Sequence, residues 1–582
     1  MKNVTKKTLS LILATVSGLS MFSMVACQPK NPDSGDNPNK RPDNLDNIST
    51  IQVAVFNGGF GYEWAEQVAA DFAEEYKDYS FEEGKKGVYV EVLKSKTLYN
   101  GSTMISRIEN KLEEVDVYYT ADEVKSVGNV AADITDIVTE KVYDADGNLA
   151  EEGKGVKSII DMLDKHYVNQ YNRGTNENPK YQYLPYEDCL TGFVYDYELF
   201  ADNGWLNYSG LDGTPKYTDE FLDLCDRIVE AGYIPWTTSM DTGWYPDNLY
   251  QGYVMQYEGE KDALLNLTLE GEYTFPAGTL SDEIVEEEGV TVNTDGTQTV
   301  MITPENAWLL VYQPGKKKMI EFCYDVTRPE YLSTNVTGAS NSFTECQKNF
   351  IMSWGYDKGG MQGGKRIAMI YEGEWWEHEA KSSFNDLDRR YPGRNLGYGQ
   401  RDLRMMPYPQ ERDGANEYDY SMYIQDASAE FVSVNSNPAK REIVKKWVQY
   451  TKSKEALKTH AQYTSLVLPY DYTLDESDMN SWTKFAKSIY KLKREQAHIY
   501  RADITDNYTH PCNKVSSSLF MTGIGWPTIW REGSSNQASY FAKFIKNPNL
   551  TATSVYNSMF KIYNKSTWAP VYQLYADRFL NN

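Results

Sequence analysis

The chain has 582 residues, which is enough for roughly two to four domains and for a large buried core. Hydrophobic residues make up 41% and charged residues 24%, a balance typical of chains that fold in water. The excess of 83 acidic over 58 basic residues gives a formal net charge of −25, which repels phosphate backbones, so nucleic acid is not expected as a partner. The 46 tyrosines and 13 tryptophans exceed what a core ordinarily needs, and we expect some of these rings on a binding surface.

Residues 1–27 are predicted to be a targeting segment rather than part of the fold. Lys2, Lys6 and Lys7 precede an apolar run from Leu9 to Val25, and the sequence Met24-Val25-Ala26-Cys27 resembles a bacterial lipobox. An ordinary secretory signal would share the basic and apolar regions, but residues 28–48 are rich in Pro, Asn and Asp, as in a disordered lipoprotein tether. We therefore expect a protein outside the cytoplasmic membrane, anchored to it only through lipid on Cys27.

The remaining cysteines indicate free thiols rather than a disulfide framework. Their spacing is wide and irregular, with no Cys-x-x-Cys pair, and at most two bridges could form. Cys225 lies in an apolar helical stripe and Cys323 lies beside Ile320 and Phe322, so both are predicted to be small core residues. The five residues are Cys189, Cys225, Cys323, Cys346 and Cys512.

The chain after the tether opens with strands and helices in alternation. Ile51–Phe56 is predicted to be a buried strand, and the helix that follows it has Trp64 in an apolar stripe that faces the core. Val88–Leu93 and Val115–Tyr119 are further predicted strands, with a helix over Met104–Leu112 between them. This order is typical of α/β construction with mainly parallel sheets, in which the loops at the carboxyl ends of the strands bind ligands.

Later segments continue the same mixture of strands and helices. Gln182–Tyr186 and Gly192–Asp196 are predicted to be extended, and residues 290–302 read as a hairpin turning at Asp295-Gly296. A helix over Pro304–Val326 is expected to break at Pro314-Gly315. A buried strand is predicted at Ile367–Ile370, and a helix that opens at Asn437-Pro438.

Motifs for catalysis or cofactor binding are mostly missing from the sequence. The five histidines include no His-Glu-x-x-His pair, and neither a Gly-x-Ser-x-Gly elbow nor a phosphate-binding Gly-x-x-x-x-Gly-Lys-Ser/Thr loop occurs. Asp144–Asn148 resembles the start of a calcium loop, but Leu149 stands where glycine is needed, so a surface turn is predicted. No cofactor or metal is expected. Paired carboxylates for glycoside hydrolysis stay open, although Glu187, Asp188 and Glu374 are better interpreted as hydroxyl acceptors or solvated groups.

The order of several segments resembles that of the extracellular solute-binding proteins of carbohydrate ABC importers, family 1. The resemblance covers roughly residues 50 to 475 and follows the lipobox and tether described above. Its segments are Asn57-Gly58-Gly59, Tyr183–Tyr186 with Gly192–Phe200, Asn203–Trp205, Pro215–Cys225, Ile367–Trp376, Met406–Pro409, Asn435–Glu455 and Tyr463–Pro469.

The resemblance implies a two-lobe periplasmic-binding-protein fold, the Venus flytrap, of α/β class. Interleaved crossings would join the lobes, and the ligand would lie in a cleft between them. The implied boundaries are 49–189 plus about 425–475 for lobe 1, and 190–424 plus about 476–582 for lobe 2. Gly192–Asp196 and Met422–Ser433 are the extended runs expected to cross between lobes.

The resemblance also implies a set of ligand-binding positions in loops at strand ends and crossings. Adjacent side chains point in different directions, so at least one of Trp375 and Trp376 should stack on the ligand. Asp122 is explained equally well as a helix N-cap. The implied positions are Asn57, Gly58, Gly59, Tyr119, Asp122, Tyr186, Glu187, Trp244, Tyr245, Glu374, Trp375, Trp376, Trp526 and Trp530.

The function implied by the resemblance is that of a cell-surface binding protein, not an enzyme. It would capture an oligosaccharide and deliver it to the permease subunits of an ABC importer. Two alternatives stay open from the sequence: a surface glycoside hydrolase, and a lipoprotein of the same fold that binds a solute other than a sugar.

Overall fold

The computed structural model describes residues 37–121, 127–175, 177–240, 244–333, 342–356, 364–424, 428–501, 540–562 and 564–579, although some side chains in α10, α22 and α23 lie outside the description. Residues from 42 onward form one compact unit, which contains two lobes with separate sheets and cores. The predicted α/β class is confirmed. The lobe boundaries expected from the sequence stay a prediction.

The first lobe is built on a four-stranded sheet in the order β12-β3-β1-β2. β1 pairs in parallel with both β2 and β3, so the loops after these three strands lie at one edge of the sheet, while β12 is antiparallel to β3. The strands are β1 (Ser49–Phe56), β2 (Val88–Ser95), β3 (Val117–Thr120) and β12 (Ala429–Val432).

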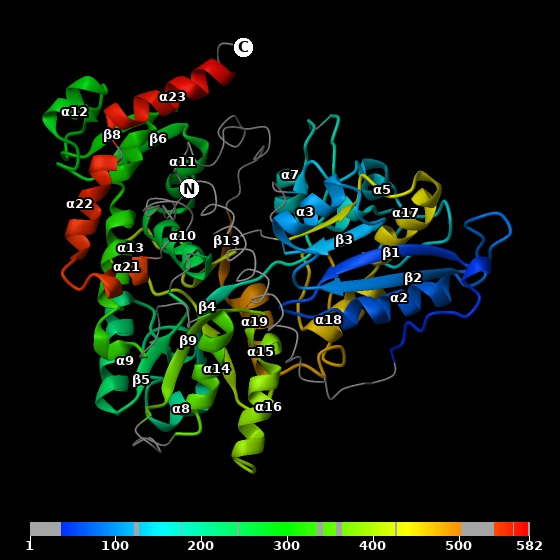
Figure 1. Cartoon of the computed structure of the whole chain (residues 1–582). Coiled ribbons are helices and arrows are strands. Elements are labelled where there is room, and N and C mark those ends of the chain that lie inside the picture. Colours follow the sequence, from blue (N-terminus) through cyan, green and yellow to red (C-terminus); the bar gives the residue numbers. More distant parts are fainter. Residues whose placement is uncertain are drawn as a thin grey trace, which may run out of the picture. The chain divides into compact units, whose positions relative to one another are not determined.

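Helices from two distant parts of the sequence cover this sheet. The core of the lobe draws on Ile51 to Tyr186 and on Ala429 to Tyr470, and Figure 1 shows the yellow helices α17 and α18 lying with the blue strands. Trp64 in α2 is only 3% exposed, so its predicted place in the core is confirmed. The helices are α2 (Glu63–Glu75), α3 (Gly101–Glu109), α5 (Thr135–Thr139), α6 (Ile159–Met162), α7 (Lys165–Gln170), α17 (Arg441–Tyr450) and α18 (Lys454–Thr464).

The second lobe has its own sheet in the order β10-β4-β9-β5. β5 and β9 are parallel, whereas β4 is antiparallel to both β9 and β10. Its strands are β4 (Thr191–Asp196), β5 (Ile234–Thr237), β9 (Ile367–Gly373) and β10 (Leu403–Met406), and a separate parallel pair joins β11 (Ser421–Ile424) to β13 (His498–Arg501).

The core of the second lobe runs from Leu190 to Ile424 and from Phe485 to Met559. Cys225 and Cys323 are fully buried in it and carry free thiols, as predicted, and Cys189 and Cys346 are also free. Cys512 lies outside the described residues. The helices are α8 (Tyr197–Asp202), α9 (Thr218–Glu230), α10 (Trp244–Glu258), α13 (Pro314–Asp325), α14 (Phe343–Ser353), α15 (Trp376–Glu379), α16 (Lys381–Arg390), α19 (Lys484–Lys491), α21 (Tyr540–Lys546) and α22 (Ala552–Ile562).

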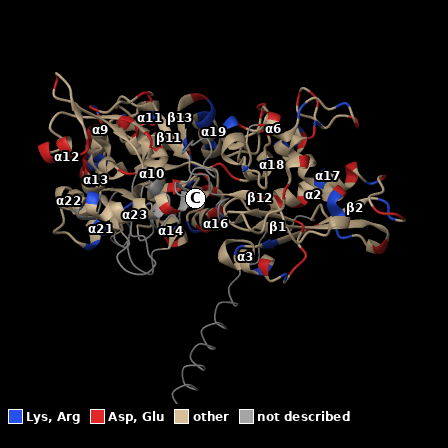
Figure 2. Cartoon of the chain, turned by 90° about the horizontal axis from the view of Figure 1, so that it is seen from above, with Lys and Arg blue, Asp and Glu red and all other residues tan. Residues whose placement is uncertain are grey.

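A third, smaller core forms around the predicted hairpin. β7 (Thr291–Val292) and β8 (Gln298–Ile302) pair as expected, and β6 (Gly271–Phe275), which the sequence analysis missed, completes the sheet. α11 (Glu260–Thr268), the acidic helix α12 (Asp282–Glu287) and the C-terminal α23 (Lys565–Phe579) accompany this sheet (Figures 1 and 2). Trp568 of α23 is 3% exposed in this core and donates from Nε1 to the backbone oxygen of Pro304 at 2.8 Å. The expected break near Pro314 also occurs, because a 3-10 segment (Ala307–Tyr312) ends where α13 begins.

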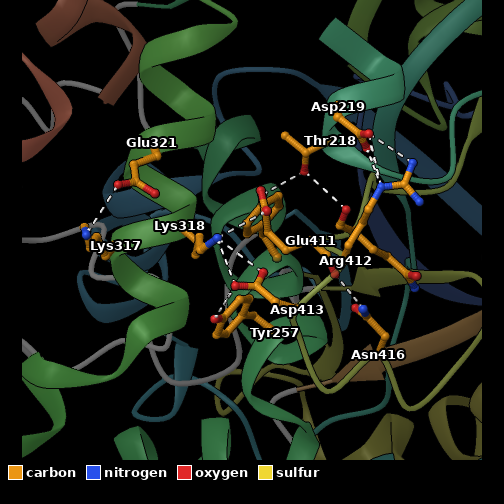
Figure 3. A network of polar contacts seen from close by, with 12 residues as sticks. Thr218, Asp219, Tyr257, Lys317, Lys318, Glu321, Glu411, Arg412, Asp413 and Asn416 are labelled. Atoms are coloured by element: carbon orange, nitrogen blue, oxygen red, sulfur yellow. Dashed lines mark hydrogen bonds and ion pairs between the residues drawn. The ribbon is translucent and has the colours of Figure 1, made fainter. Parts of the chain in front are cut away.

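A polar network holds the connection between β10 and β11 against the helices of the second lobe (Figure 3). The Nζ atom of Lys318 in α13 lies 3.5 Å from Glu411 and 3.1 Å from Asp413. Arg412 reaches Asp219 of α9 at 3.0 Å. The connection that leads into β11 is therefore fixed to the body of this lobe.

Candidate functional site

The loop after β1 meets the second lobe at the carboxyl edge of the first sheet. The backbone oxygen of Gly59 lies 3.0 Å from Nδ1 of His378 in α15, which therefore carries the proton. Gly59 has a φ of +52°, and a Cβ added there would lie 3.4 Å from Cβ of Trp375. Glycine thus permits both the left-handed turn and the close approach. Asn57 is exposed and Gly58 partly exposed at the start of this loop.

The two adjacent tryptophans after β9 have different surroundings. Trp375 is partly exposed and packs against the cores of both lobes. Trp376 is fully buried, with ring centroids 5.6 Å from Phe384 and 5.7 Å from Phe350. A ring without exposed surface has no face for a ligand, so the structure corrects the candidate position Trp376 to a core residue and leaves Trp375 as the one ring of the pair that could stack.

Two tyrosines expected at the ligand lie inside the first lobe instead. Tyr119 and Tyr186 are each 2% exposed and pack on Trp64 at centroid distances of 5.1 and 5.9 Å. The hydroxyl of Tyr119 donates to Glu430 Oε1 at 3.2 Å, and burial, followed by the charge of Glu430, raises the pKa of Tyr119 well above its usual range. Burial also lowers the pKa of the neighbouring His460 to about 3, so its ring is neutral. Both tyrosines therefore serve the core in this structure.

Glu374 is held at the base of the site by groups of the second lobe. Its Oε2 atom accepts from the backbone N–H of Leu190 at 3.1 Å and from Lys493 Nζ at 3.2 Å. The side chain is buried, and burial raises its pKa. In this structure the Glu374 carboxyl therefore holds the chain segment at Leu190 in place, and it does not lie on an open surface.

Glu187 is partly exposed in the segment that joins the lobes. Its backbone N–H donates to Ser428 Oγ at 2.5 Å, and its backbone oxygen accepts from the same hydroxyl at 2.9 Å. Burial, followed by the charge of Glu374, raises the pKa of Glu187 to about 8. The carboxyl is therefore mostly protonated at neutral pH.

Several expected positions cannot be placed. Asp122, Trp526, Trp530 and Cys27 lie outside the described residues. Trp244 and Tyr245 form the first turn of α10, but their side chains are not described.

A cavity that Glu374 helps to line brings together residues that the sequence analysis missed. Phe60 and Thr464 line it from the first lobe, and Glu377, His378 and Thr483 line it from the second. Thr483 donates to Glu377 Oε2 at 2.5 Å, and burial raises the pKa of Glu377 to about 7. The one feature of the sequence that could have indicated this cavity is that Glu377 and His378 directly follow the two tryptophans.

The part of the site that the structure describes holds no cluster suited to a metal. Among the described residues, no three or more His, Cys, Asp or Glu side chains are grouped so that they could hold an ion. In the same part of the chain, no helix combines the length and apolar character needed to cross a bilayer.

Comparison with known proteins identifies the fold. No protein-family model matches the chain, and no curated protein matches its sequence. A solved chitin oligosaccharide binding protein is similar to it over 90% of this chain and 99% of the other, with a TM-score of 0.51 and 14% sequence identity.

Two other solved structures show weaker similarity. The solute-binding protein RafE in complex with raffinose has a TM-score of 0.47 and 13% identity, covering 90% of this chain and 100% of that one. A manno-oligosaccharide specific solute binding protein from Bifidobacterium animalis subsp. lactis, in complex with mannotriose, has a TM-score of 0.48 and 12% identity, covering 93% of this chain and 99% of that one. The similarity to the chitin oligosaccharide binding protein confirms, at the level of the fold, the resemblance drawn from the sequence.

Proposed function

We propose that this protein captures an oligosaccharide between its two lobes and delivers it to the permease subunits of an ABC importer. The main support for this proposal is the position of Trp375, a partly exposed ring that packs against both cores beside the loop at Gly59. A flat ring placed where two lobes meet suits the apolar face of a sugar, which offers no charge to pair. The fold shared with the chitin oligosaccharide binding protein supports this use of the site.

The remaining contacts would come from polar groups around this ring. Asn57 is exposed at the edge of the first sheet and could bind hydroxyl groups, and Glu187 is partly exposed at the crossing. Trp244 and Tyr245 stay candidates at the start of α10, as do Asp122, Trp526 and Trp530. Hydrogen bonds to sugar hydroxyls orient the ligand, and stacking supplies much of the affinity.

Binding is favoured over glycoside hydrolysis by the position of Glu374. A general acid or base must reach the proton that it transfers, but this carboxyl is buried and is already bonded to Leu190 and Lys493. The hydrolase is therefore the weaker alternative. A lipoprotein of the same fold that binds a different solute remains the other alternative.

A glycan array probed with the mature protein tests the proposed function. We expect binding to a family of related oligosaccharides, weakened in Trp375→Ala and retained in Trp375→Phe, which keeps an aromatic ring. Mass spectrometry after prolonged incubation should find the bound glycans intact. Cleaved products would favour the hydrolase, and an array without any bound glycan would favour the solute other than a sugar.

The membrane anchor is proposed from the sequence. Two acyl chains on Cys27 would give stable anchoring, and the tether over residues 28–48 would separate the fold from the bilayer. Mass spectrometry of the native N-terminus should show a diacylglyceryl adduct on Cys27, and Cys27→Ser should release the protein from membranes. An unmodified N-terminus cut elsewhere would refute the anchor.

A further inference from the structure

The loop after β1 begins with an asparagine that is followed directly by glycine. Such a pair can react internally, because the backbone nitrogen of the glycine can attack the side-chain carbonyl carbon of the asparagine. Glycine favours this attack, since it has no side chain to hinder its nitrogen or to restrict its backbone angles. The sequence contains three such pairs: Asn57-Gly58, Asn100-Gly101 and Asn203-Gly204.

The two reacting groups of the first pair are free in this structure. The side chain of Asn57 is exposed, and no hydrogen bond with the described residues engages its amide or the N–H of Gly58. The bonds nearest to the pair join Asn57 N–H to the backbone oxygen of Ser95 at 3.4 Å and Gly61 N–H to the backbone oxygen of Gly58 at 3.1 Å. Neither of these bonds involves the attacking nitrogen or the amide that would leave.

Both reacting groups are engaged at the pair that ends α8. Nδ2 of Asn203 donates to the backbone oxygen of Leu199 at 2.8 Å, and the N–H of Gly204 donates to the backbone oxygen of Ala201 at 3.1 Å. The nitrogen would have to leave its bond, and the side chain would have to turn away from Leu199, before the two groups could meet. The end of α8 therefore protects this pair.

The pair at the start of α3 is held by its asparagine. Oδ1 of Asn100 accepts from the hydroxyl of the fully buried Thr120 at 3.1 Å. Its backbone oxygen accepts from the N–H of Met104 at 3.4 Å, because Asn100 is the N-cap of the helix. The side chain is thus directed toward β3. Of the three pairs, all of which the structure describes, Asn57-Gly58 is the one in which both reacting groups are free.

We propose that Asn57-Gly58 is a site of spontaneous deamidation, and that its conversion weakens sugar binding; the second part rests on the proposed function. The Gly58 nitrogen forms a bond to Cγ of Asn57, the bond from Cγ to Nδ2 breaks, and ammonia leaves with the proton of the Gly58 N–H. Water then opens the cyclic imide at either carbonyl carbon, which gives aspartate or isoaspartate. In sum, an amide and water become an acid and ammonia.

Either product changes the loop that lies against Trp375. A carboxylate only accepts hydrogen bonds, so the donor that the Asn57 amide offers to a sugar hydroxyl is lost and a negative charge takes its place. Isoaspartate also adds one carbon to the backbone, and the loop has little room for it. A Cβ added at Gly58 would lie 2.5 Å from the ring of Phe56, and one added at Gly59 would lie 3.4 Å from Cβ of Trp375. The lengthened backbone should therefore shift Gly59 relative to this ring.

Peptide mapping by mass spectrometry tests the first part on the mature, ligand-free protein. The protein is held at mildly alkaline pH in water labelled with heavy oxygen, once folded and once in guanidinium chloride, and the three asparagines are followed over time. The rate at Asn57 should agree within about threefold between the two conditions, since no hydrogen bond has to break. Asn100 and Asn203 should convert at least about tenfold more slowly in the folded chain than in the unfolded one, because their bonds must break first. The heavy oxygen should appear in the new carboxyl.

Calorimetric titration with a glycan identified on the array tests the second part. Parent protein aged until Asn57 is converted should bind about fivefold to tenfold more weakly than fresh parent, which is the scale of one lost hydrogen bond. Asn57→Gln is the matched control, because glutamine would have to close a larger ring and converts far more slowly. Whatever its starting affinity, the aged Asn57→Gln protein should bind like its own fresh sample.

Two results would overturn the proposal. Conversion at Asn57 that is slowed by folding as much as at Asn100 and Asn203 would show that its reacting groups are not free. Unchanged affinity after complete conversion would show that the modification does not affect the site. The mapping uses no sugar, so its failure leaves the proposed function untouched. If the array finds no sugar, the second part fails with the proposed function, and the first part is decided by the mapping alone.

Discussion

Replacing the two adjacent tryptophans by alanine, one at a time, separates their roles. Trp376 is fully buried. Its ring packs between Phe350, Phe384 and Phe485, at centroid distances of 5.7, 5.6 and 6.0 Å. Loss of such a ring leaves a cavity, so Trp376→Ala should lower the free energy of unfolding by about 3–5 kcal/mol. Trp375 is partly exposed, so Trp375→Ala should cost less stability.

For ligand affinity the order of the two variants should be reversed, with the larger loss in Trp375→Ala. If Trp375 is the main platform for the sugar, its removal should cost about 2 kcal/mol of binding free energy, which corresponds to about a thirtyfold weaker affinity. Trp376→Ala should bind like the parent at temperatures where it is folded.

Calorimetric titration with a glycan identified on the array, together with thermal melts, measures both quantities. Trp375→Phe serves as the control that keeps a ring, and it should lose much less affinity than Trp375→Ala. Unchanged affinity in Trp375→Ala, combined with weaker binding by a stable Trp376→Ala, would refute the assignment of the two rings.

Three further changes test other parts of the structure. A Cβ added at Gly373 would lie 2.2 Å from the ring of Trp375, so Gly373→Ala should displace the ring and weaken binding in a titration; unchanged affinity would contradict a platform role. Lys452→Met leaves the 2% exposed Glu430 without its cation and should cost about 3–5 kcal/mol in denaturant unfolding, and a change below about 1 kcal/mol would show that the pair is not buried in solution. Trp568→Ala should speed hydrogen exchange in α23 while the cores of the two lobes keep their protection, and equal exchange would show that this ring does not hold the helix.

The sequence predicts local elements well where a single pattern repeats over several residues. The apolar stripe that contains Trp64 repeats at helical spacing and faces the core in α2, because a helix must bury the face on which such residues gather. The turn at Gly296 identifies its hairpin, since few residues accept its positive φ of 84°. The position of Cys225 in a helical stripe likewise predicts its complete burial.

The candidate site depends on contacts between segments far apart in the sequence. Trp375 and Trp376 are identical in type and adjacent, so no pattern distinguishes the ring that packs on Phe384 from the ring that lies between two cores. Tyr119 lies at the end of its predicted strand, but its ring is covered by Trp64 and Tyr186, and its hydroxyl donates to Glu430, which is 311 residues away in the sequence. Periodicity records which face of an element is apolar. It does not record which other element covers that face, and this is why only packing in three dimensions shows that Tyr119 and Trp376 belong to a core while Trp375 keeps an exposed part.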